Sequence, residues 1–481
     1  MKEDLAYLLR RTSIIDIVDY LEVRYKKKGF NYAKVYREFR KLRPLLGPKD
    51  CSFLCQYLLK NNFITHFMID EEDKTLCKLF FISETMRENY LQSGDIILID
   101  STYNTNIYKT PLVVFSGIAN DGSNLLFGLA FVNNERYETY KWVIDHFLNL
   151  KEDLPKLVVT DGDLAICKVI SEYSHSITHF ICQWHLARNI NRKMCYLKKK
   201  HLEEYQMLMR LPYHTKQDIF EETIEKLKSF FDTDEMKDTH KKSKAYLEEL
   251  LGYKTKWANC YKPLIFTAGT NTTSRAESMN RHIKRYMNSE CELSSIIEFI
   301  KYIENSQAFQ DPLEKTTRLL KTQHDLDPML TSIKEEVGQI IFQKHYNEYL
   351  NSFNYHLKQS AEYCFQVKRD GIERDDVEVA YRTVYLDNEK SLFACDCELF
   401  IVEGIICRHM FVTARINQIH TLSKYVYPRW RVKLFPEKKM HNFSADAVKE
   451  AKKMDNDIKI EENEARKEEG SSWRESCKFP I

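Results

Sequence analysis

The stretch Asp95-Ile-Ile-Leu-Ile-Asp100-Ser-Thr-Tyr-Asn places an aspartate directly after a short apolar run. A run of this kind predicts a strand that is buried on both faces. Further along the chain, Lys156-Leu-Val-Val-Thr-Asp161-Gly-Asp repeats the pattern. The carboxyl ends of neighbouring parallel strands meet at the same end of a sheet. We therefore expect Asp100 and Asp161 to face one site.

A third acid, Glu277, lies near the start of a helix that we expect over residues 274–288. Glu277, Asn280, Arg281 and Lys284 stand at i, i+3, i+4 and i+7, so they share one polar face. The opposite face carries an apolar stripe of Met279, Ile283, Tyr286 and Met287. The pattern therefore directs Glu277 away from the core, together with cations that could hold a DNA backbone.

Two strand-end aspartates and a helical glutamate predict metal-dependent phosphoryl transfer on DNA. This chemistry needs carboxylates that bridge two cations lying ~3.5–4 Å apart. Asp163 competes with Asp161 for this role, but it lies beyond the glycine turn and is less well placed. Each acid taken alone could also be a turn residue or a helix cap.

The segments around the aspartates predict an open mixed sheet with flanking helices, which makes the fold class α/β. A hairpin with a charged turn is expected after residue 66, and Asn120-Asp-Gly-Ser forms a second hairpin turn. The expected strands are 95–100, 111–118, 125–132, 157–160 and 178–182, and the expected helices are 137–150 and 165–173.

The remaining segments predict a helical insertion within the core and additional regions on both sides of it. Residues 292–365 have helical patterns, and residues 363–393 are strand-like. The expected regions are a helical N-terminal region (1–66), a first core part (67–185), a helical insertion (186–265), core completion with the Glu277 helix and further helices (266–365), a small C-terminal zinc-binding module (366–435) and a charged, partly disordered tail (436–481).

The N-terminal helices place Lys34, Arg37 and Arg40 roughly on one face. This face could belong to a small DNA-contacting module. A plain helical lead-in with a solvated basic face explains the same pattern, so both interpretations stay open.

The strongest local motif is Cys395-Asp-Cys397, followed by nine residues and then Cys407-Arg-His409. In an extended segment, residues i and i+2 point to the same side, so Cys395 and Cys397 can hold one ion. Cys407 and His409 complete a tetrahedral set of three sulfurs and one nitrogen, which is typical of structural zinc. The motif therefore predicts one zinc ion with a stabilising or binding role.

Cys182-Gln-Trp-His185 follows the last expected strand of the sheet. Two ligands at i and i+3 make only half of a metal site. A buried histidine held by hydrogen bonds, a metal ligand, and a side chain that positions DNA or a catalytic carboxylate all remain possible roles.

Composition limits the class of protein. The chain has 481 residues, 43% apolar and 30% charged, with a net charge of +2. No apolar run approaches the ~18 residues of a membrane span, and the N-terminus shows no secretory signal. Thirteen cysteines without an export signal indicate reduced thiols or metal ligands. We expect an intracellular protein with no membrane partner.

These motifs, in this order, resemble Mutator-like element (MULE) transposases and the plant far-red-response transcription factors derived from them. The resemblance covers about residues 60–435 and includes a SWIM-type zinc motif, the pairs CxC and CxH. The matching stretches are Asp100-Ser-Thr-Tyr-Asn-Thr-Asn, Val159-Thr-Asp161-Gly-Asp, Cys182-Gln-Trp-His185-Leu-Ala-Arg-Asn189, Thr272-Thr-Ser-Arg-Ala-Glu277-Ser-Met-Asn280 and Tyr425-Val-Tyr-Pro-Arg-Trp430.

The resemblance implies a ribonuclease H-like catalytic core in which Asp100, Asp161 and Glu277 bind two Mg²⁺ (or Mn²⁺) ions. It implies cleavage at terminal inverted repeats and attack of the 3′-hydroxyl on target DNA, in a nuclear protein that works as a dimer or higher oligomer. Cys182 and His185 would then support the active site. Many relatives carry an N-terminal zinc-binding domain that recognises DNA, whereas here Cys51 and Cys55 lack a partner pair.

Three functions follow from these residues. The first is a DDE transposase that cleaves and joins double-stranded DNA, the second a domesticated, non-catalytic DNA-binding regulator, and the third a nuclease without joining activity. Active-site support would come from Cys182, His185 and Asn280. The candidate DNA contacts are Arg188, Arg192, Lys193, Lys198, Lys199, Lys200, Arg281, Lys284, Arg429 and Arg431.

Overall fold

The protein is described by a computed structural model, which divides the chain into two compact units. Unit 1 consists of residues 1–117, 125–186 and 272–311, and unit 2 of residues 118–124, 187–271 and 312–481. The described residues are 50–70, 72, 75–232, 237–270, 274–308, 326–361, 363–370, 381–387 and 392–432. The expected N-terminal basic face (Lys34, Arg37, Arg40) and charged tail (436–481) lie outside these ranges.

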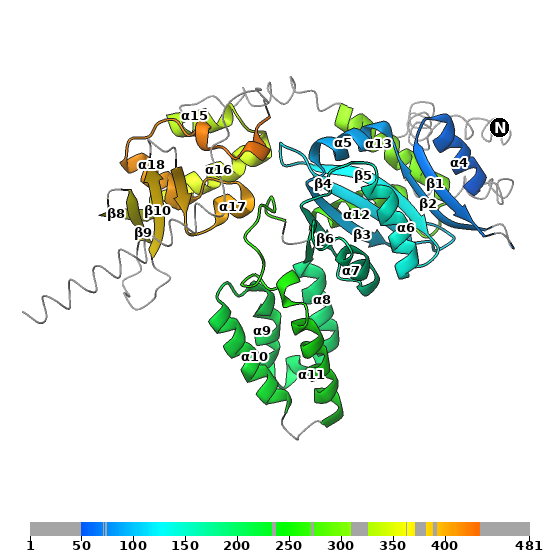
Figure 1. Ribbon diagram of the computed structural model, residues 1–481, viewed down its shortest axis with the longest axis horizontal. Coiled ribbons are helices and arrows are strands. Elements are labelled where there is room, and N and C mark those ends of the chain that lie inside the picture. Colours follow the sequence, from blue (N-terminus) through cyan, green and yellow to red (C-terminus); the bar gives the residue numbers. More distant parts are fainter. Residues whose placement is uncertain are drawn as a thin grey trace, which may run out of the picture. The chain divides into compact units, whose positions relative to one another are not determined.

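A seven-stranded mixed sheet forms the centre of unit 1 (Figure 1). Its spatial order is β1-β2-β5-β4-β3-β6-β7. The strands are β1 (Ile64–Ile69), β2 (Leu76–Ile82), β3 (Ile96–Thr102), β4 (Leu112–Ile118), β5 (Asn124–Val132), β6 (Leu157–Thr160) and β7 (Thr178–Ile181). The α/β class and the mixed sheet that the sequence predicts are therefore confirmed.

Strand direction changes at β3, and this change creates the site. β3 pairs with β4 in antiparallel orientation but with β6 in parallel orientation, and β6 pairs in parallel with β7. In the β3–β6 register, Ile99 lies opposite Thr160. Asp100 directly follows Ile99, and Asp161 directly follows Thr160, so the two aspartates lie at the same end of the sheet.

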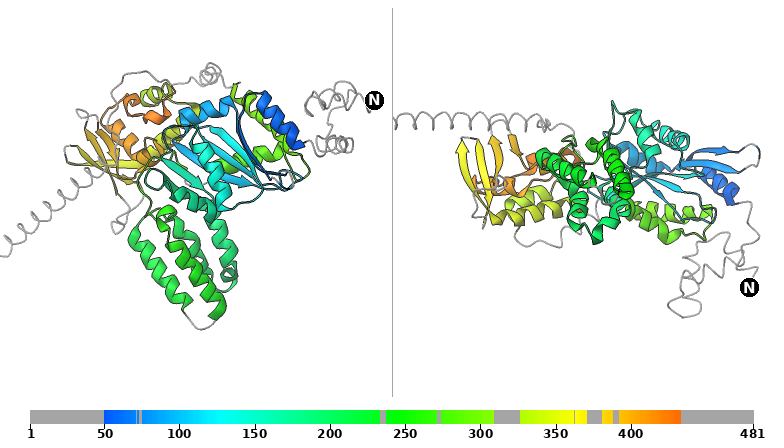
Figure 2. Two further views of the ribbon diagram at one scale, coloured as in Figure 1. Left: turned by 45° about the vertical axis from the view of Figure 1, so that its right-hand side comes forward. Right: turned by 90° about the horizontal axis from the view of Figure 1, so that it is seen from below.

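Helices cover both faces of this sheet, and Figure 2 shows α6 on one face and the α12–α13 pair on the other. α6 packs on β2, whereas α12 packs on β3. The helices are α4 (Asp50–Lys60), α5 (Glu84–Ser93), α6 (Tyr137–Leu148), α7 (Leu164–Ser171), α12 (Ser274–Tyr286) and α13 (Ile296–Ala308), with the short η6 (Leu293–Ser295) before α13.

The sequence analysis missed α5. Its composition is polar, but Ser83 caps its first turn by accepting a hydrogen bond from Met86 N at 3.3 Å. Met86 and Tyr90, one turn apart, are buried. A single apolar stripe of two residues is too short to reveal a helix by periodicity.

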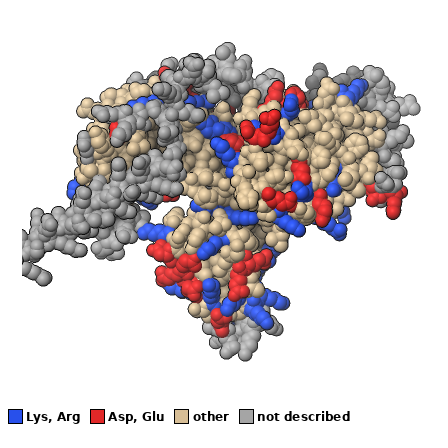
Figure 3. All heavy atoms as spheres, viewed as in Figure 1, with Lys and Arg blue, Asp and Glu red and all other residues tan. Residues whose placement is uncertain are grey.

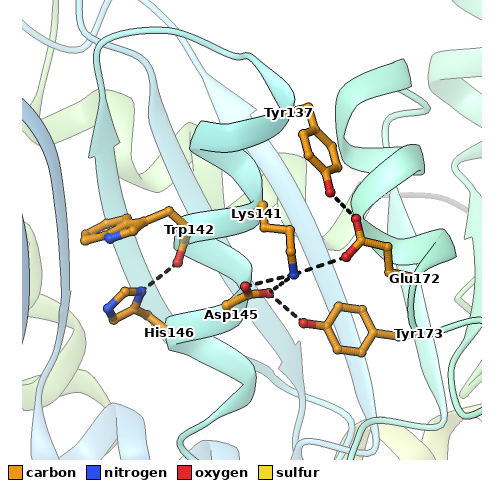
Figure 4. Close-up of polar contacts among 7 residues, drawn as sticks. All are labelled: Tyr137, Lys141, Trp142, Asp145, His146, Glu172 and Tyr173. Carbon is orange, nitrogen blue, oxygen red and sulfur yellow. Dashed lines mark hydrogen bonds and ion pairs between the residues drawn. The ribbon is translucent and has the colours of Figure 1, made fainter.

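A polar network joins α6 to α7 on the outside of unit 1 (Figure 4). Lys141 Nζ lies 2.9 Å from Asp145 Oδ2 and 3.1 Å from Glu172 Oε2. The Tyr173 hydroxyl donates to Asp145 Oδ1 at 2.6 Å, and the Tyr137 hydroxyl donates to Glu172. These contacts join the helices that follow β5 and β6.

After β7 the chain enters a helical segment, most of which belongs to unit 2. The core of this insertion contains Phe220, Leu227, Leu247 and Trp257, all fully buried. Acidic and basic side chains alternate over the visible face of α9–α11 (Figure 3). The elements are α8 (Gln183–Met194), η2 (Cys195–Lys199), α9 (Leu202–Arg210), η3 (Leu211–Tyr213), α10 (Gln217–Phe231), α11 (Lys237–Leu251) and η5 (Lys254–Lys256).

The C-terminal part of unit 2 contains a four-stranded antiparallel sheet in the order β11-β10-β9-β8. α18 packs against all four strands and against α16. The strands are β8 (Tyr355–Ala361), β9 (Cys364–Arg369), β10 (Tyr381–Asp387) and β11 (Leu392–Cys395). The helices are α15 (Pro328–Lys334), α16 (Gln339–Asn351), η7 (Ser352–Asn354), α17 (Leu399–Glu403), α18 (Arg408–Ile416), η8 (Ser423–Tyr425) and η9 (Pro428–Trp430).

The helical prediction for residues 355–361 is wrong. This segment is β8, an outer strand in which Tyr355 and Leu357 are half-buried while His356 and Lys358 are exposed. The local sequence does not determine the conformation of this segment. Pairing with β9 makes it a strand. Among the helices in the described ranges, none is long and apolar enough to cross a membrane.

Candidate active site

Asp100 lies near the carboxyl end of β3, and its side chain is only 4% exposed. Asn280 on α12 donates a hydrogen bond from Nδ2 to Asp100 Oδ2 at 2.6 Å. Asn280 Oδ1 is also buried and accepts no hydrogen bond from the described residues. The amide therefore orients one carboxylate oxygen, and its own oxygen is left as a further potential ligand in the site.

Asp161 and Asp163 have different roles. Asp163 Oδ1 accepts hydrogen bonds from Ala165 N at 2.8 Å and Ile166 N at 3.3 Å, so this carboxylate caps α7. Asp161 follows β6 directly and accepts a hydrogen bond from Asp163 N at 3.0 Å. Between them, Gly162 has φ +87°, a conformation that favours glycine and turns the chain into the cap. Asp161 is thus the acid at the strand end.

Glu277 lies in the first turn of α12 and is half-buried. Its charge and that of Asp161 act on Asp100: burial, with these two charges adding to it, raises the pKa of Asp100 to about 8. The structure therefore brings Asp100, Asp161 and Glu277, here called the acidic trio, within electrostatic range of one another. The predicted apolar stripe of α12 is buried at Met279, Ile283 and Met287.

Burial also raises the pKa of Asp161 to about 6, and the charges of Asp163 and Glu135 add to this effect. With a pKa of about 8, Asp100 holds its proton at neutral pH unless a cation replaces it, whereas Asp161, with a pKa of about 6, is mostly ionised. Oxygen-rich acidic sites of this kind suit hard divalent cations.

A fourth acid, Glu135, was missed by the sequence analysis. It lies between β5 and α6, and its Oε1 accepts hydrogen bonds from the Tyr103 hydroxyl at 2.6 Å and the Tyr140 hydroxyl at 2.7 Å. No strand-end pattern marks this residue, because β5 ends three residues earlier, at Val132. Only the folded chain brings Glu135 to the β3 end.

Cys182 and His185 lie at the start of α8, directly after β7. Cys182 is fully buried, and its sulfur accepts a hydrogen bond from the His185 backbone N–H at 3.4 Å. Cys182 therefore acts as a cap for the amino end of α8. His185 is half-buried beside the Trp184 ring, and its role in metal binding or in positioning DNA stays a prediction.

The four predicted zinc ligands meet in unit 2. Ligand atoms of Cys395, Cys397, Cys407 and His409 all lie within 4.8 Å of one another, and we call this set the Cys/His cluster. Cys395 ends β11, Cys397 follows in a turn, and Cys407 and His409 lie at the start of α18. Cys397 is thus held by a turn and not by the extended segment that we expected. Three sulfurs and one nitrogen at this spacing could bind one structural zinc ion.

Burial raises the pKa values of the Cys395 and Cys407 thiols, whereas hydrogen bonds from these two thiols lower the pKa of Cys397. A cation is the natural means of holding all three sulfurs as thiolates. Arg408, between Cys407 and His409, forms a two-pronged ion pair with Glu348 on α16, with nitrogen–oxygen distances of 2.9 and 2.7 Å. This pair anchors the ligand-bearing start of α18.

The candidate DNA contacts fall into two groups. The exposed group includes the cations of α12 and those at and after α8. Its members are Arg188, Arg192, Lys193, Lys198, Lys199, Lys200, Arg281 and Lys284. Lys193 also lies 3.9 Å from the centre of the Tyr246 ring.

Arg429 and Arg431 form the second group, which is half-buried and makes contacts within the chain, and their role as DNA contacts stays a prediction. Arg429 donates to Asn120 Oδ1 at 2.5 Å and to Ile118 O at 2.6 Å. Arg431 pairs with Glu336 Oε2 at 2.9 Å and donates to Ser423 O at 2.8 Å. Internal acceptors therefore occupy both guanidinium groups.

Comparison with known proteins agrees with these features. Residues 96–189 match the family model of the MULE transposase domain, and this range contains Asp100, Asp161, Cys182 and His185. The Arabidopsis thaliana protein FAR1-RELATED SEQUENCE 5 is 24% identical over 84% of this chain and 51% of its own length. FAR-RED IMPAIRED RESPONSE 1 from the same plant is 25% identical over 79% of this chain and 46% of its own length.

The chain thus spans about half the length of these curated relatives. Among solved structures, the Drosophila P element transposase strand transfer complex aligns with a TM-score of 0.28 and 10% identity, over 62% of this chain and 94% of that chain.

Proposed function

We propose that this chain, in which residues 96–189 match the family model of the MULE transposase domain, is a DDE-type DNA transposase with a ribonuclease H-like core. The observation that carries the proposal is the effect of Asp161 and Glu277 on Asp100, whose pKa they help to raise. These three acids come from segments far apart in the sequence. A chain gains nothing in stability from gathering buried like charges, so such a group indicates a functional site.

The chemistry of the donor set fits divalent cations. Asp100, Asp161 and Glu277 would hold two Mg²⁺ or Mn²⁺ ions, and the buried Asn280 Oδ1 adds a neutral oxygen nearby. When bound, such ions lower the pKa of an attacking water or 3′-hydroxyl and stabilise the leaving oxygen of a phosphodiester. The protein itself would hold the carboxylate and amide oxygens in place and keep other ligand atoms out of the site.

Asn280 performs part of this positioning. Its hydrogen bond to Asp100 Oδ2 helps to fix the orientation of this carboxylate. Arg281 and Lys284, exposed on the same helix, would contact the phosphates on either side of the cleaved bond. The exposed cations at and after α8 would extend this contact to double-stranded DNA. Binding would then weaken steeply as salt concentration rises.

The Cys/His cluster would bind one zinc ion with a structural role. All four positions of a tetrahedral site come from the chain, so no position is left for a reacting water. We assign this part of unit 2 to stability and binding. We further propose nuclear localisation and an assembly of two or more copies, since two DNA ends must be brought together.

The second candidate is a domesticated DNA-binding regulator on the same fold. The relatives named for the far-red response favour it. Both candidates share the fold and the DNA partner, so only the chemistry separates them.

The test is a cleavage and strand-transfer assay on DNA that carries the inverted repeats flanking this gene, with Mg²⁺ or Mn²⁺. The variants are Asp100→Ala, Asp161→Ala and Glu277→Ala, with Asp153→Ala as the control, because Asp153 is an exposed acid of unit 1. We expect metal-dependent 3′-hydroxyl ends and joined products from the wild type and the control, and from none of the three variants.

Two other outcomes would change the assignment. If the wild type binds the repeats but never cuts them, the regulator is the correct function. If it cuts without joining, the protein is a nuclease.

A further inference from the structure

We propose that Tyr103 holds the DNA strand beside the acidic trio by stacking its ring on a base, and that Glu135 is the positioning residue that fixes this ring. The inference rests on the proposed action on DNA, and it adds a substrate contact that the trio does not supply.

Tyr103 combines exposure with restraint. It follows β3, three residues after Asp100, and its side chain is 46% exposed. Its hydroxyl nevertheless donates a hydrogen bond of 2.6 Å to Glu135 Oε1. Burial, Glu135 and the charges of Asp161 and Asp163 together raise the pKa of Tyr103, so the phenol is neutral and lies within electrostatic range of the strand-end acids.

Glu135 is itself anchored from the other side. The Tyr140 hydroxyl on α6 donates to the same oxygen, Glu135 Oε1, at 2.7 Å, and Tyr140 is only 1% exposed. The Tyr140 oxygen also lies 3.1 Å from Ser101 Oγ. A phenol has one hydrogen, which goes to Glu135, so Ser101 donates to Tyr140. The chain Ser101–Tyr140–Glu135 therefore links the residue after Asp100 to the Tyr103 ring.

This arrangement suits a stacking contact. An exposed aromatic side chain normally loses rotational freedom when it binds, whereas a ring already held by a hydrogen bond loses less. Stacking on an aromatic ring is a contact that bases of any sequence can make, and it needs a base that is not stacked in the duplex. The expected ligand is thus an unpaired or unstacked nucleotide near the phosphate that reacts.

A purely structural role would use the same hydrogen bonds to join β3 to the β5–α6 connection. The two roles differ in what they require. Stacking needs the ring and gains from its restraint, whereas a structural link needs the hydroxyl. Tyr103→Phe keeps the ring and removes the hydroxyl, so this variant separates the two roles.

The experiment measures binding of the full chain to a partial duplex with a single-stranded 3′ tail that carries 5-iododeoxyuridine. The buffer has low salt and contains no Mg²⁺ or Mn²⁺. We expect the photo-crosslink to map to Tyr103, and Tyr103→Ala to bind about tenfold more weakly, because stacking is worth roughly 1–3 kcal/mol per base. Tyr103→Phe and Glu135→Ala both keep the ring but remove the hydrogen bond that restrains it, so each should weaken binding only roughly two- to fivefold.

The matched control is Tyr108→Ala. Tyr108 is 50% exposed in the same unit, but the charges that act on it are Asp50 and Glu292 instead of the trio. It should bind as the wild type does. Thermal unfolding of every variant shows whether the fold is retained, and Glu135→Gln, which keeps an acceptor oxygen, should recover most of the binding that Glu135→Ala loses.

Wild-type affinity of Tyr103→Ala would overturn the proposal. So would a Tyr103→Phe variant that loses as much binding and stability as Tyr103→Ala, because the hydroxyl would then be the working group. The assay needs no cleavage. If the wild type binds through Tyr103 but never cuts DNA, the stacking proposal holds and the transposase assignment fails. If Tyr103→Ala cuts DNA as the wild type does, the transposase assignment holds and the stacking proposal fails.

Discussion

The two candidate metal centres of this chain are built in opposite ways. The Cys/His cluster takes its four ligands from one short stretch, residues 395–409, and their ligand atoms already lie within 4.8 Å of one another. The acidic trio takes its ligands from β3, from the residue after β6 and from α12, which are far apart in the sequence. The acids of the trio repel one another, as the contribution of Asp161 and Glu277 to the raised pKa of Asp100 indicates.

Under the proposed function, the stability of the fold and the activity would depend on different metals. The cluster can be a folding element, because its ligands form a closed set. The trio costs the fold free energy until a cation binds, since burial raises the pKa of Asp100 to about 8.

The largest loss of stability should follow from removing a zinc ligand of the Cys/His cluster. Cys407→Ser should reduce bound zinc from one ion per chain to none and unfold the β8–β11 module, because structural zinc contributes on the order of 10 kcal/mol in small zinc domains. Zinc content and limited proteolysis measure both changes. Cys364→Ser is the control, since Cys364 is buried in β9 outside the cluster. Equal zinc loss in both variants would refute the ligand assignment.

The next effect concerns pH and the trio. The folded-state pKa of Asp100, about 8, is above the ordinary value. Its contribution to the free energy of unfolding is therefore full below pH ~4 and is lost as pH rises through ~8. At pH 9, Asp100→Asn should be more stable than the wild type by about 1–4 kcal/mol.

Chemical denaturation between pH 5 and 9 checks this prediction, with Asp153→Asn as the exposed control. Addition of Mn²⁺ at pH 8 should raise the unfolding midpoint of the wild type but not of Asp100→Asn. A wild type with constant stability across this range would contradict the like-charge account of the trio.

A smaller effect is expected from the anchor of the cluster. Arg408→Met removes the ion pair with Glu348, whose side chain is only 13% exposed. Leaving this carboxylate without its cation should cost about 1–3 kcal/mol and weaken zinc binding. Denaturation and competition with a zinc chelator measure the two effects. The double variant Arg408→Met/Glu348→Met should recover part of the lost stability. If it does not, the Arg408–Glu348 ion pair is not the contact that anchors α18.

The smallest effect should come from Cys182. Its sulfur caps α8 through the His185 N–H, so Cys182→Ala should cost about 1 kcal/mol, partly by loss of the cap and partly by loss of packing. Cys182→Ser, which keeps an acceptor, should cost less. DNA cleavage by Cys182→Ser near the wild-type rate would agree with the capping role, whereas loss of Mg²⁺- or Mn²⁺-dependent activity at full stability would assign the sulfur to the active site.

Much of the fold could be predicted because its signals are local. The strands that carry Asp100 and Asp161 are continuous apolar runs, and parallel pairing follows from the intervening helices. The zinc ligands could be recognised from spacing alone. The sequence failed at α5 and β8: the first has too few apolar residues to show a period, and the second takes its conformation from pairing with β9.

The sequence by itself therefore determined which residues end the central strands and which four can hold zinc. Three features appear only in the folded chain: Asn280 bonds to Asp100, the charge of Glu135 acts on Asp161, and Arg429 bonds to Asn120. The physical reason is that a hydrogen-bond partner, a neighbouring charge and the burial that shifts a pKa depend on segments far apart in the chain. No local pattern records such segments, because their distance is set only when the core packs.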